Sequence, residues 1–177
     1  MGNSESLAQA FVAVGSNLEP ERNIPKALDL AMKRLRVTGV STFYRTEPLG
    51  RAKQPPFLNG VWEVASPCGP RELKFDILRP IEEQLGRVRG ADKYAARTID
   101  LDIAVFGRTV VNEEDLRIPD PDIRVRAFLA VALFELAGDI VLPDTGEALA
   151  GVVHALSSTR LVPDPAFTNR LKARLSG

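Results

Sequence analysis

Two segments with a helical repeat stand between four segments with strand character, and this order limits the possible folds more than any other feature. The strand-like runs are residues 11–14, 37–46, 57–64 and 99–106. Each run is short, rich in apolar or β-branched residues, and bounded by turn residues. Apolar residues recur every three or four positions within 24–35 and 70–85, which predicts helices there. The order β, α, β, β, α, β favours an α+β domain with a mostly antiparallel sheet and helices on one face.

Prolines and turn residues divide the rest of the chain. Pro80 removes a backbone donor and predicts a kink near Asp76 in the second helix. Residues 46–56 and 87–98 predict two long loops, because the first is proline-rich and the second is polar without an apolar period. Later segments predict an edge strand at 109–111, an acidic connection at 112–124, a helix at 126–136, a strand at 140–142 and a final helix at 147–156.

The size and charge of the chain suit one soluble domain. We expect a single domain over 1–177, with a core of about 10–157 and a basic, weakly ordered tail at 160–177. The 23 basic residues balance the 23 acidic ones, which gives no global electrostatic reason to bind nucleic acid or a membrane. No apolar run approaches the ~20 residues of a membrane span, and the first ten residues, which include Glu5, lack a signal-peptide pattern. One cysteine is compatible with a reducing compartment, so we expect a cytoplasmic protein.

Asp100 and Asp102 form the sharpest local motif, at the start of an apolar strand. A two-residue step advances ~6.6 Å along a strand and returns to the same face, so both carboxylates project together. Such a pair can hold one or two Mg²⁺ ions, which leave coordination sites for substrate phosphates. A solvated strand end is the alternative interpretation of the pair.

The loop before this pair is basic. Its cations are Arg87, Arg89, Lys93 and Arg97. They can surround a polyphosphate, although solvated surface is the alternative interpretation. The chain contains neither a P-loop nor a Rossmann glycine pattern, so the phosphates would be held by side chains.

Phe57 and Asn59 suggest a site for a planar ring. They lie on the same face of a predicted strand, where the amide can read a heterocycle edge and the aromatic ring can stack on it. Packing is the alternative for both. His154 and Cys68 have no visible partners and are expected to be structural.

Several motifs, taken in order, resemble the 6-hydroxymethyl-7,8-dihydropterin pyrophosphokinases of folate biosynthesis. The motifs are VGSNL at 14–18, STFYRTEPLG at 41–50, Gln54, FLN at 57–59, IE at 81–82, LGRVR at 85–89, RTIDLDI at 97–103, IP at 118–119 and RAF at 126–128. The resemblance covers most of the chain. It implies a ferredoxin-like α+β sandwich that transfers pyrophosphate from ATP to the pterin hydroxymethyl group and releases AMP.

The resemblance also implies roles for individual residues. Asp100 and Asp102 would hold two Mg²⁺ ions on ATP, and Arg87 and Arg97 would take part in catalysis. The pterin would lie against Thr46, Leu49, Phe57, Asn59, Tyr94 and Phe128. ATP would contact Glu82, Arg87, Arg89, Arg97, Ile103, Asp120 and Arg126. The two long loops would close over the substrates, and we expect a monomer or a weak homodimer.

Three positions depart from the family pattern. Asp120 stands where the family usually has His, Tyr94 where it has Trp, and Ala96 where it has Pro. A carboxylate at 120 repels phosphate unless it turns away, pairs with Arg124 or Arg126, or joins a metal. Two alternatives therefore stay open: a pterin- or nucleotide-binding paralogue with little or no activity, and another Mg²⁺-dependent phosphoryl or nucleotidyl transferase with a different acceptor.

Overall fold

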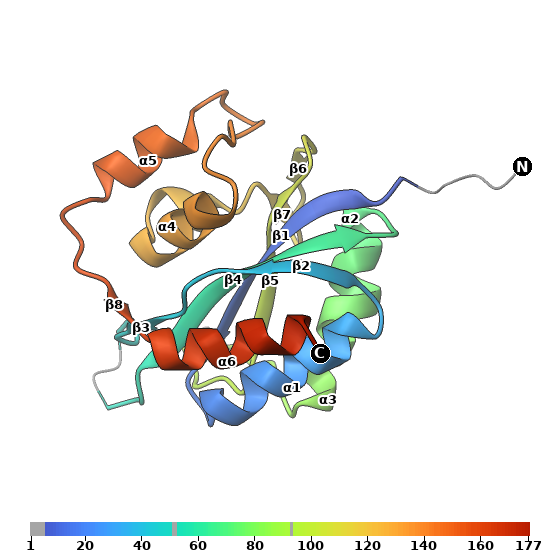
Figure 1. The fold of residues 1–177 in the computed structure, drawn as a ribbon, viewed down its shortest axis with the longest axis vertical. Helices are drawn as coiled ribbons and strands as arrows, with labels where there is room; N and C mark the ends of the chain where they lie inside the picture. Colours follow the sequence, from blue (N-terminus) through green and yellow to red (C-terminus); the bar gives the residue numbers. More distant parts are fainter. Residues whose placement is uncertain (1–5, 51–52, 93) are drawn as a thin grey trace, which may run out of the picture.

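An antiparallel sheet runs through the middle of the molecule and has helices on both sides (Figure 1). The computed structural model describes residues 6–50, 53–92 and 94–177, so Glu5, residues 51–52 and Lys93 lie outside it. The strands of the sheet are β1 (Ala8–Ser16), β2 (Arg36–Val40), β3 (Tyr44–Thr46), β4 (Phe57–Ser66), β5 (Asp100–Phe106) and β8 (Val162–Pro163).

The order of the strands confirms the predicted α+β sandwich with ferredoxin-like topology. The sheet runs β5, β1, β4, β3, β8, and β2 also pairs with β4. The fourth, first, third and second of the predicted strand segments therefore lie side by side. Among the described residues, every pairing within this sheet is antiparallel and β5 pairs only with β1, so that its other edge has no strand beside it.

The prediction of one strand over 37–46 was wrong, because the structure divides this segment into β2 and β3. Between them the Phe43 side chain turns into the core and lies against Gly60, where an added Cβ would come within 2.5 Å of the ring. The Ser41 side chain accepts a 2.9 Å hydrogen bond from the Val61 amide, which continues the pairing with β4 across the break. Burial of an aromatic ring thus interrupts a segment whose composition favours one strand.

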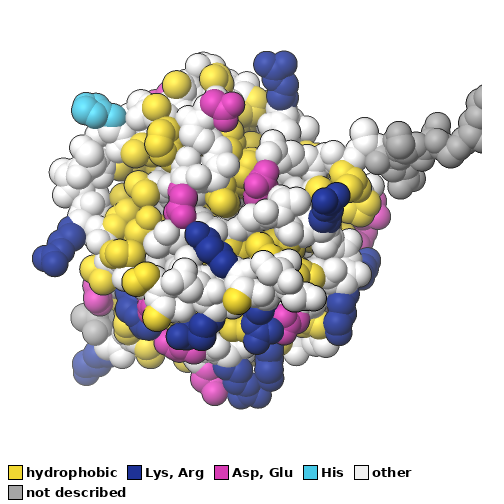
Figure 2. All heavy atoms as spheres, viewed as in Figure 1, with side chains coloured by type: hydrophobic (Ala, Val, Ile, Leu, Met, Phe, Trp, Pro, Cys, Tyr) yellow, Lys and Arg dark blue, Asp and Glu magenta, His cyan; other side chains and the backbone are white. Residues whose placement is uncertain are grey.

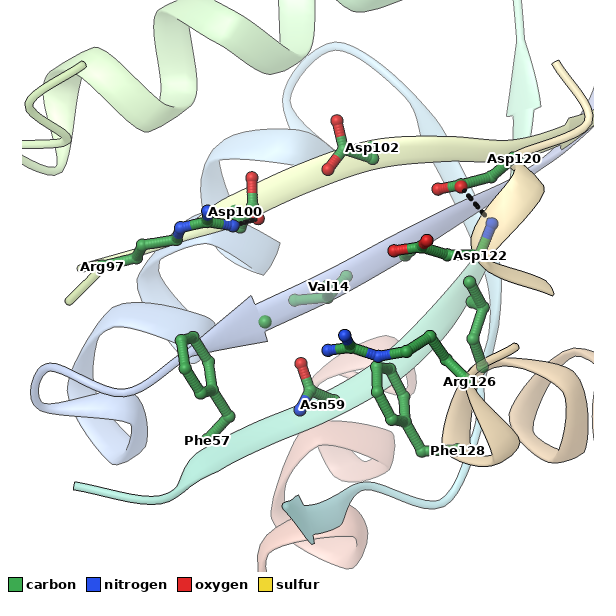
Figure 3. Close-up of a pocket in the computed structure, with 13 residues that line it drawn as sticks. Val14, Phe57, Asn59, Arg97, Asp100, Asp102, Asp120, Asp122, Arg126 and Phe128 are labelled. Carbon is green, nitrogen blue, oxygen red and sulfur yellow. Dashed lines mark hydrogen bonds and ion pairs between the residues drawn. The ribbon is translucent and has the colours of Figure 1, made fainter. Parts of the chain in front are cut away.

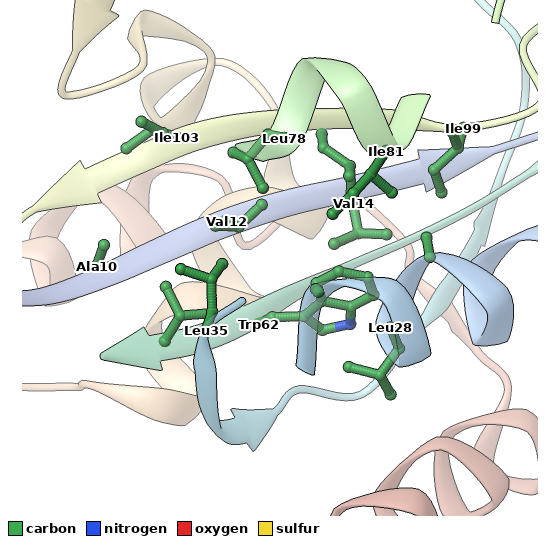
Figure 4. Close-up of a cluster of buried hydrophobic side chains, with 14 of the residues drawn as sticks. Ala10, Val12, Val14, Leu28, Leu35, Trp62, Leu78, Ile81, Ile99 and Ile103 are labelled. Carbon is green, nitrogen blue, oxygen red and sulfur yellow. The ribbon is translucent and has the colours of Figure 1, made fainter. Parts of the chain in front are cut away.

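Helices cover both faces of the sheet, which corrects the expectation that they lie on one face. On one side lie α1 (Pro20–Met32), α2 (Pro70–Glu72), the π-helical segment η1 (Leu73–Leu78), α3 (Arg79–Gln84) and α6 (Pro165–Leu175). On the other side lie α4 (Ala127–Leu136) and α5 (Leu149–Ala155). Val12 and Val14 of β1 belong to the first core cluster (Figure 4), and Phe11 belongs to the second. Strands buried on both faces lose the alternation that would have revealed this.

Pro80 produces a wide turn. The predicted helix over 70–85 begins and ends as α-helix, but its middle is η1, in which the Arg79 amide donates to the Lys74 carbonyl five residues back. The proline ring would collide with the carbonyl four residues before it, and the wider turn avoids that contact. The expected kink therefore takes the form of a π-helical turn.

The C-terminal tail is a packed helix, so the expectation of weak order at 160–177 was wrong. Asp164 caps α6 by accepting a 3.0 Å hydrogen bond from the Phe167 amide. Phe167 and Leu171 are buried in the first core cluster, and the Phe167 ring meets Phe43 edge-on at 5.4 Å. The core therefore extends past residue 157.

Smaller differences concern the segment after β5. The edge strand predicted at 109–111 is β6 (Val111–Asn112), which pairs with β7 (Arg117–Ile118) in a separate hairpin, and the acidic connection also contains the 3₁₀ turn η2 (Pro121–Arg124). Residues 140–142 form no strand and make one bridge between Val141 and Ala148.

None of the helices within the described ranges has the length and apolar character needed to cross a membrane. Figure 2 shows acidic and basic side chains mixed over one face of the molecule.

Candidate active site

A cavity of about 590 Å³ opens between the sheet and the start of α4 (Figure 3). Its lining comes from β1, β4, β5, η2, α4 and the loop that precedes β5. The lining residues are Ala13, Val14, Gly15, Phe57, Asn59, Arg97, Asp100, Asp102, Asp120, Asp122, Arg126, Phe128 and Leu129. Segments distant in the sequence thus converge on one face of the sheet.

The two carboxylates of β5 both line this cavity. Arg97 forms an ion pair with Asp100, and the Arg87 guanidinium lies 3.6 Å from the same carboxylate. The ammonium of Lys74 lies 2.6 Å from Asp102. Each carboxylate therefore has cationic partners in the protein itself.

Burial and neighbouring charges move the two pKa values apart. Burial raises the pKa of Asp100, and the adjacent Asp102 carboxylate raises it further against the opposing effect of the arginines. The Asp102 side chain is 47% exposed, and its partial burial alone would raise its pKa, but the charge and hydrogen bond of Lys74, with Arg97, bring the pKa below its ordinary value. Asp102 is thus the more firmly ionised member of the pair.

The donor chemistry of the pair suits a divalent cation that arrives with phosphates. Mg²⁺ takes one or two carboxylates from a protein and completes its shell with water and phosphate oxygens. Within the described ranges no group of three or more metal-binding side chains is present. Asp100 and Asp102 supply the two carboxylates, and the cavity leaves space beside them.

The opposite end of the cavity has the features of a ring-binding pocket. Phe57 and Phe128 flank Asn59 (Figure 3), whose Nδ2 donates a 2.6 Å hydrogen bond to the Thr46 hydroxyl. Gly15 provides the room for this amide, because a Cβ at that position would lie 2.5 Å from Asn59 Oδ1. The amide thus lies between two aromatic side chains.

The two loops form a second cavity of about 840 Å³ beside the first. It shares Phe57, Arg97 and Arg126 with the first cavity and adds Leu49 and Tyr94. The Leu49 side chain is 54% exposed and that of Tyr94 is 44% exposed. Over the described residues both predicted loops are irregular, and they form the outer wall of the ring pocket.

Asn17 joins these two loops, although no role was predicted for it. Its Nδ2 donates to the Gln54 side chain at 3.1 Å, and its Oδ1 accepts a 2.7 Å hydrogen bond from the Arg97 amide. Gln54 in turn donates to the Tyr94 carbonyl at 2.9 Å. Two sequence signals pointed to Asn17: its position in the turn after the first strand and its place in the VGSNL motif of the family resemblance.

Other predicted ATP contacts lie away from the first cavity. Arg87 and Arg89 line a neighbouring cleft of about 520 Å³, which Arg97 also lines. Glu82 is fully buried, where it pairs with Arg89 and accepts a 2.7 Å hydrogen bond from the Leu101 amide. The Ile103 side chain lies in the first core cluster. The roles of these residues toward ATP stay predictions.

Asp120 lines the cavity and also caps η2, where its side chain accepts a 2.8 Å hydrogen bond from the Asp122 amide (Figure 3). Burial raises the pKa of Asp120 to about 6, and the other carboxylates of the cavity add to this shift. Arg124 pairs with Asp144 and not with Asp120. Sequence reasoning missed Asp122, which lines both cavities from the exposed side of η2.

Fold and site together define a class: a small-molecule transferase whose cavity joins a ring pocket to a carboxylate and arginine site. Residues 11–138 match the family model described as 7,8-dihydro-6-hydroxymethylpterin-pyrophosphokinase (HPPK). This match extends over more than half of the chain, and the chain therefore belongs to the HPPK family.

Curated relatives agree with this assignment. A 2-amino-4-hydroxy-6-hydroxymethyldihydropteridine pyrophosphokinase from Pseudomonas aeruginosa is 42% identical over 142 residues, which cover 78% of this chain and 86% of the relative. The enzyme of the same name from Haemophilus influenzae is 37% identical, over 78% of this chain and 88% of the relative. The folic acid synthesis protein fol1 of Pneumocystis carinii is 34% identical over 97% of this chain, which spans 23% of that longer protein.

Solved structures show the same fold. The wild-type HPPK-DHPS of Plasmodium falciparum with SDX-DHP matches with a TM-score of 0.68 at 12% identity. The match covers 86% of this chain and 45% of that one, so this chain spans less than half of the solved protein. At this identity the likeness concerns the fold alone.

Proposed function

We propose that this protein transfers the pyrophosphate of ATP to the hydroxymethyl group of 6-hydroxymethyl-7,8-dihydropterin and releases AMP. One observation carries the proposal: the ring pocket and the carboxylate pair open onto the same cavity. A reaction between a planar heterocycle and a polyphosphate requires this juxtaposition. Family membership and the names of the curated relatives support the same reaction.

The ring end of the cavity would bind the pterin. Phe57 and Phe128 flank the space from two elements and can stack on its faces. Asn59 offers donors and an acceptor to the polar edge, and the Thr46 hydroxyl lies beside it. Leu49 and Tyr94 would cover the ring from the loops.

The charged end of the cavity would bind ATP. We assign Arg97 and Arg126 to the phosphates, because Arg97 pairs with Asp100 and Arg126 lines both cavities beside Phe128. Asp100 and Asp102 would hold two Mg²⁺ ions, which neutralise the charge of the triphosphate when bound. Contacts of Arg87, Arg89, Glu82, Ile103 and Asp120 with ATP belong to the same proposal.

In the proposed reaction, the hydroxymethyl oxygen of the pterin forms a bond to the β-phosphorus. The bond from that phosphorus to the oxygen bridging toward the α-phosphorus breaks, AMP leaves with that oxygen, and the hydroxyl proton passes to solvent. The aromatic pocket aligns the hydroxyl, and Arg97 and Arg126 stabilise the charge that develops on the phosphates. Leu49 and Tyr94 exclude water, which is the competing acceptor.

Product identification tests this proposal directly. The protein is incubated with Mg²⁺, ATP and the dihydropterin, and the products are identified by mass. Pterin diphosphate and AMP in equal amounts are expected. ADP as the stoichiometric product would contradict pyrophosphate transfer, and pterin binding without turnover would favour the inactive paralogue.

We also propose that residues 1–177 act as a single domain in the cytoplasm, as a monomer or a weak homodimer. The continuous sheet and the packing of α6 on the same core as α1 support the single domain. Size-exclusion chromatography with light scattering measures the oligomeric state.

A further inference from the structure

The outer edge of β5 is bonded by two side chains from the helical segment that packs beside it. The Leu101 amide donates to Glu82 at 2.7 Å, and the Leu101 carbonyl accepts a hydrogen bond from Lys74 Nζ, also at 2.7 Å. Both backbone groups of this edge residue are therefore satisfied by charged side chains. Asp100 and Asp102, one position to either side, are anchored by this arrangement.

The π-helical turn explains how one helix presents both side chains to the strand. Lys74 and Glu82 are eight positions apart, which in a continuous α-helix separates them by about 80° around the axis. The wide turn of η1 takes up about one extra residue and reduces this separation to about 20°. Pro80, by favouring the wide turn, thus aligns Lys74 with Glu82.

Lys74 makes a second contact that reaches the site itself. Its ammonium lies 2.6 Å from Asp102 Oδ1, and its side chain is only 8% exposed. A buried ammonium needs acceptors, and Lys74 has two: the strand carbonyl and the carboxylate. The same cation therefore fixes the backbone between the two carboxylates and the orientation of one of them.

We propose that Lys74 is a positioning residue and an internal counter-ion, which neutralises and orients Asp102 until a divalent cation binds at the pair. The proposal deepens the proposed function, on which it rests for the metal site. Two carboxylates on one strand face repel each other, and a tethered ammonium relieves this repulsion without solvent ions. A metal ion must then share Asp102 with Lys74, so the protein itself weakens metal binding in exchange for an ordered site.

Binding of Mn²⁺ tests this competition without relying on turnover. Mn²⁺ is titrated into wild-type protein and Lys74→Met in the presence of a non-hydrolysable ATP analogue, and bound metal is followed by electron paramagnetic resonance. Lys74→Met keeps the unbranched shape of the side chain up to the ε position but removes the ammonium and its charge, so it should bind Mn²⁺ roughly tenfold more tightly. Its thermal midpoint without metal should fall, and saturating Mn²⁺ should raise that midpoint more than in the wild type.

Three further variants make the result specific. Lys74→Arg keeps the charge and should bind Mn²⁺ like the wild type. Lys74→Gln retains a hydrogen-bond donor without the charge and should bind Mn²⁺ as Lys74→Met does. It takes the place of Lys74→Met if that variant does not fold. Lys172→Met is the matched control, because that lysine lies near a different carboxylate, Glu135, at 3.9 Å on the surface. It should leave Mn²⁺ binding unchanged.

The outcomes separate this proposal from the proposed function. Equal Mn²⁺ affinity in the wild type and in both neutral variants would overturn the role of Lys74 while leaving the metal site intact. Absence of Mn²⁺ binding in all of them would overturn the metal site and the counter-ion role together. Tighter binding in the neutral variants, lost again when Asp102→Asn is added, is the expected result.

Discussion

The two ends of the active-site cavity are built in different ways. At the charged end, Asp100 and Asp102 lie on a strand of the sheet, and their partners Lys74 and Arg87 are almost fully buried. At the ring end, Asn59 is also fixed on a strand, but Leu49 and Tyr94 lie on loops and are about half exposed. In the proposed function the charged end would therefore be fixed by ion pairs before substrates bind, whereas part of the ring end would depend on the loops. This difference suits a reaction in which charge must be placed accurately and water must be excluded afterwards.

The largest expected effect lies at the charged end. Asp102→Asn removes one carboxylate of the proposed metal pair, and we expect kcat to fall by about 10³-fold or more. Product formation under saturating substrates measures this. Circular dichroism should show an unchanged fold, and near-normal turnover would remove Asp102 from the metal site.

The next largest effect tests the rigid part of the ring end. Asn59→Ala removes the amide that reads the pterin edge and should weaken pterin binding by about 10²-fold. Gly15→Ala should act in the same direction, because its Cβ would displace Asn59 Oδ1. Calorimetric titration with the dihydropterin measures both. Unchanged affinity in both variants would show that the amide does not contact the substrate.

Asp120 lines the same cavity and should make the stability of the protein depend on pH. Its folded-state pKa of about 6 exceeds the unfolded value, so its contribution to stability is complete below about pH 4 and is lost as the pH rises through 6. Asp120→Asn keeps the capping acceptor but has no carboxyl group that can ionise. Between pH 4 and pH 7 the free energy of unfolding of the wild type should therefore fall by about 1–2 kcal/mol more than that of the variant. Urea unfolding at both pH values measures the difference between variant and wild type. Parallel pH profiles would contradict the raised pKa.

The smallest effect is expected on the loops. Tyr94→Ala removes part of the exposed wall and should raise the KM for the pterin by about three- to tenfold. The free energy of unfolding should change by less than about 0.5 kcal/mol, because the side chain is nearly half exposed. Steady-state kinetics and urea unfolding check the two parts. A loss as large as that of Asn59→Ala would erase the proposed contrast between strand and loop.

Local patterns in the sequence determined most of the elements and the chemistry of both ends. Period-two spacing correctly placed Asp100 with Asp102, and Phe57 with Asn59, on one face of the sheet. Turn residues and prolines correctly predicted two irregular loops over the described residues. These inferences succeeded because they depend only on a strand step or a turn, which neighbouring residues control.

Tertiary structure alone decided what covers each element and which distant side chains pair. The sequence did not reveal helices on both faces of the sheet, because doubly buried strands carry no alternation. It also did not reveal that the tail buries Phe167 against Phe43, or that Asn17 joins the two loops. Lys74 is the sharpest case: its burial is stable only because Asp102 and the Leu101 carbonyl, distant in sequence, meet its ammonium in the folded chain.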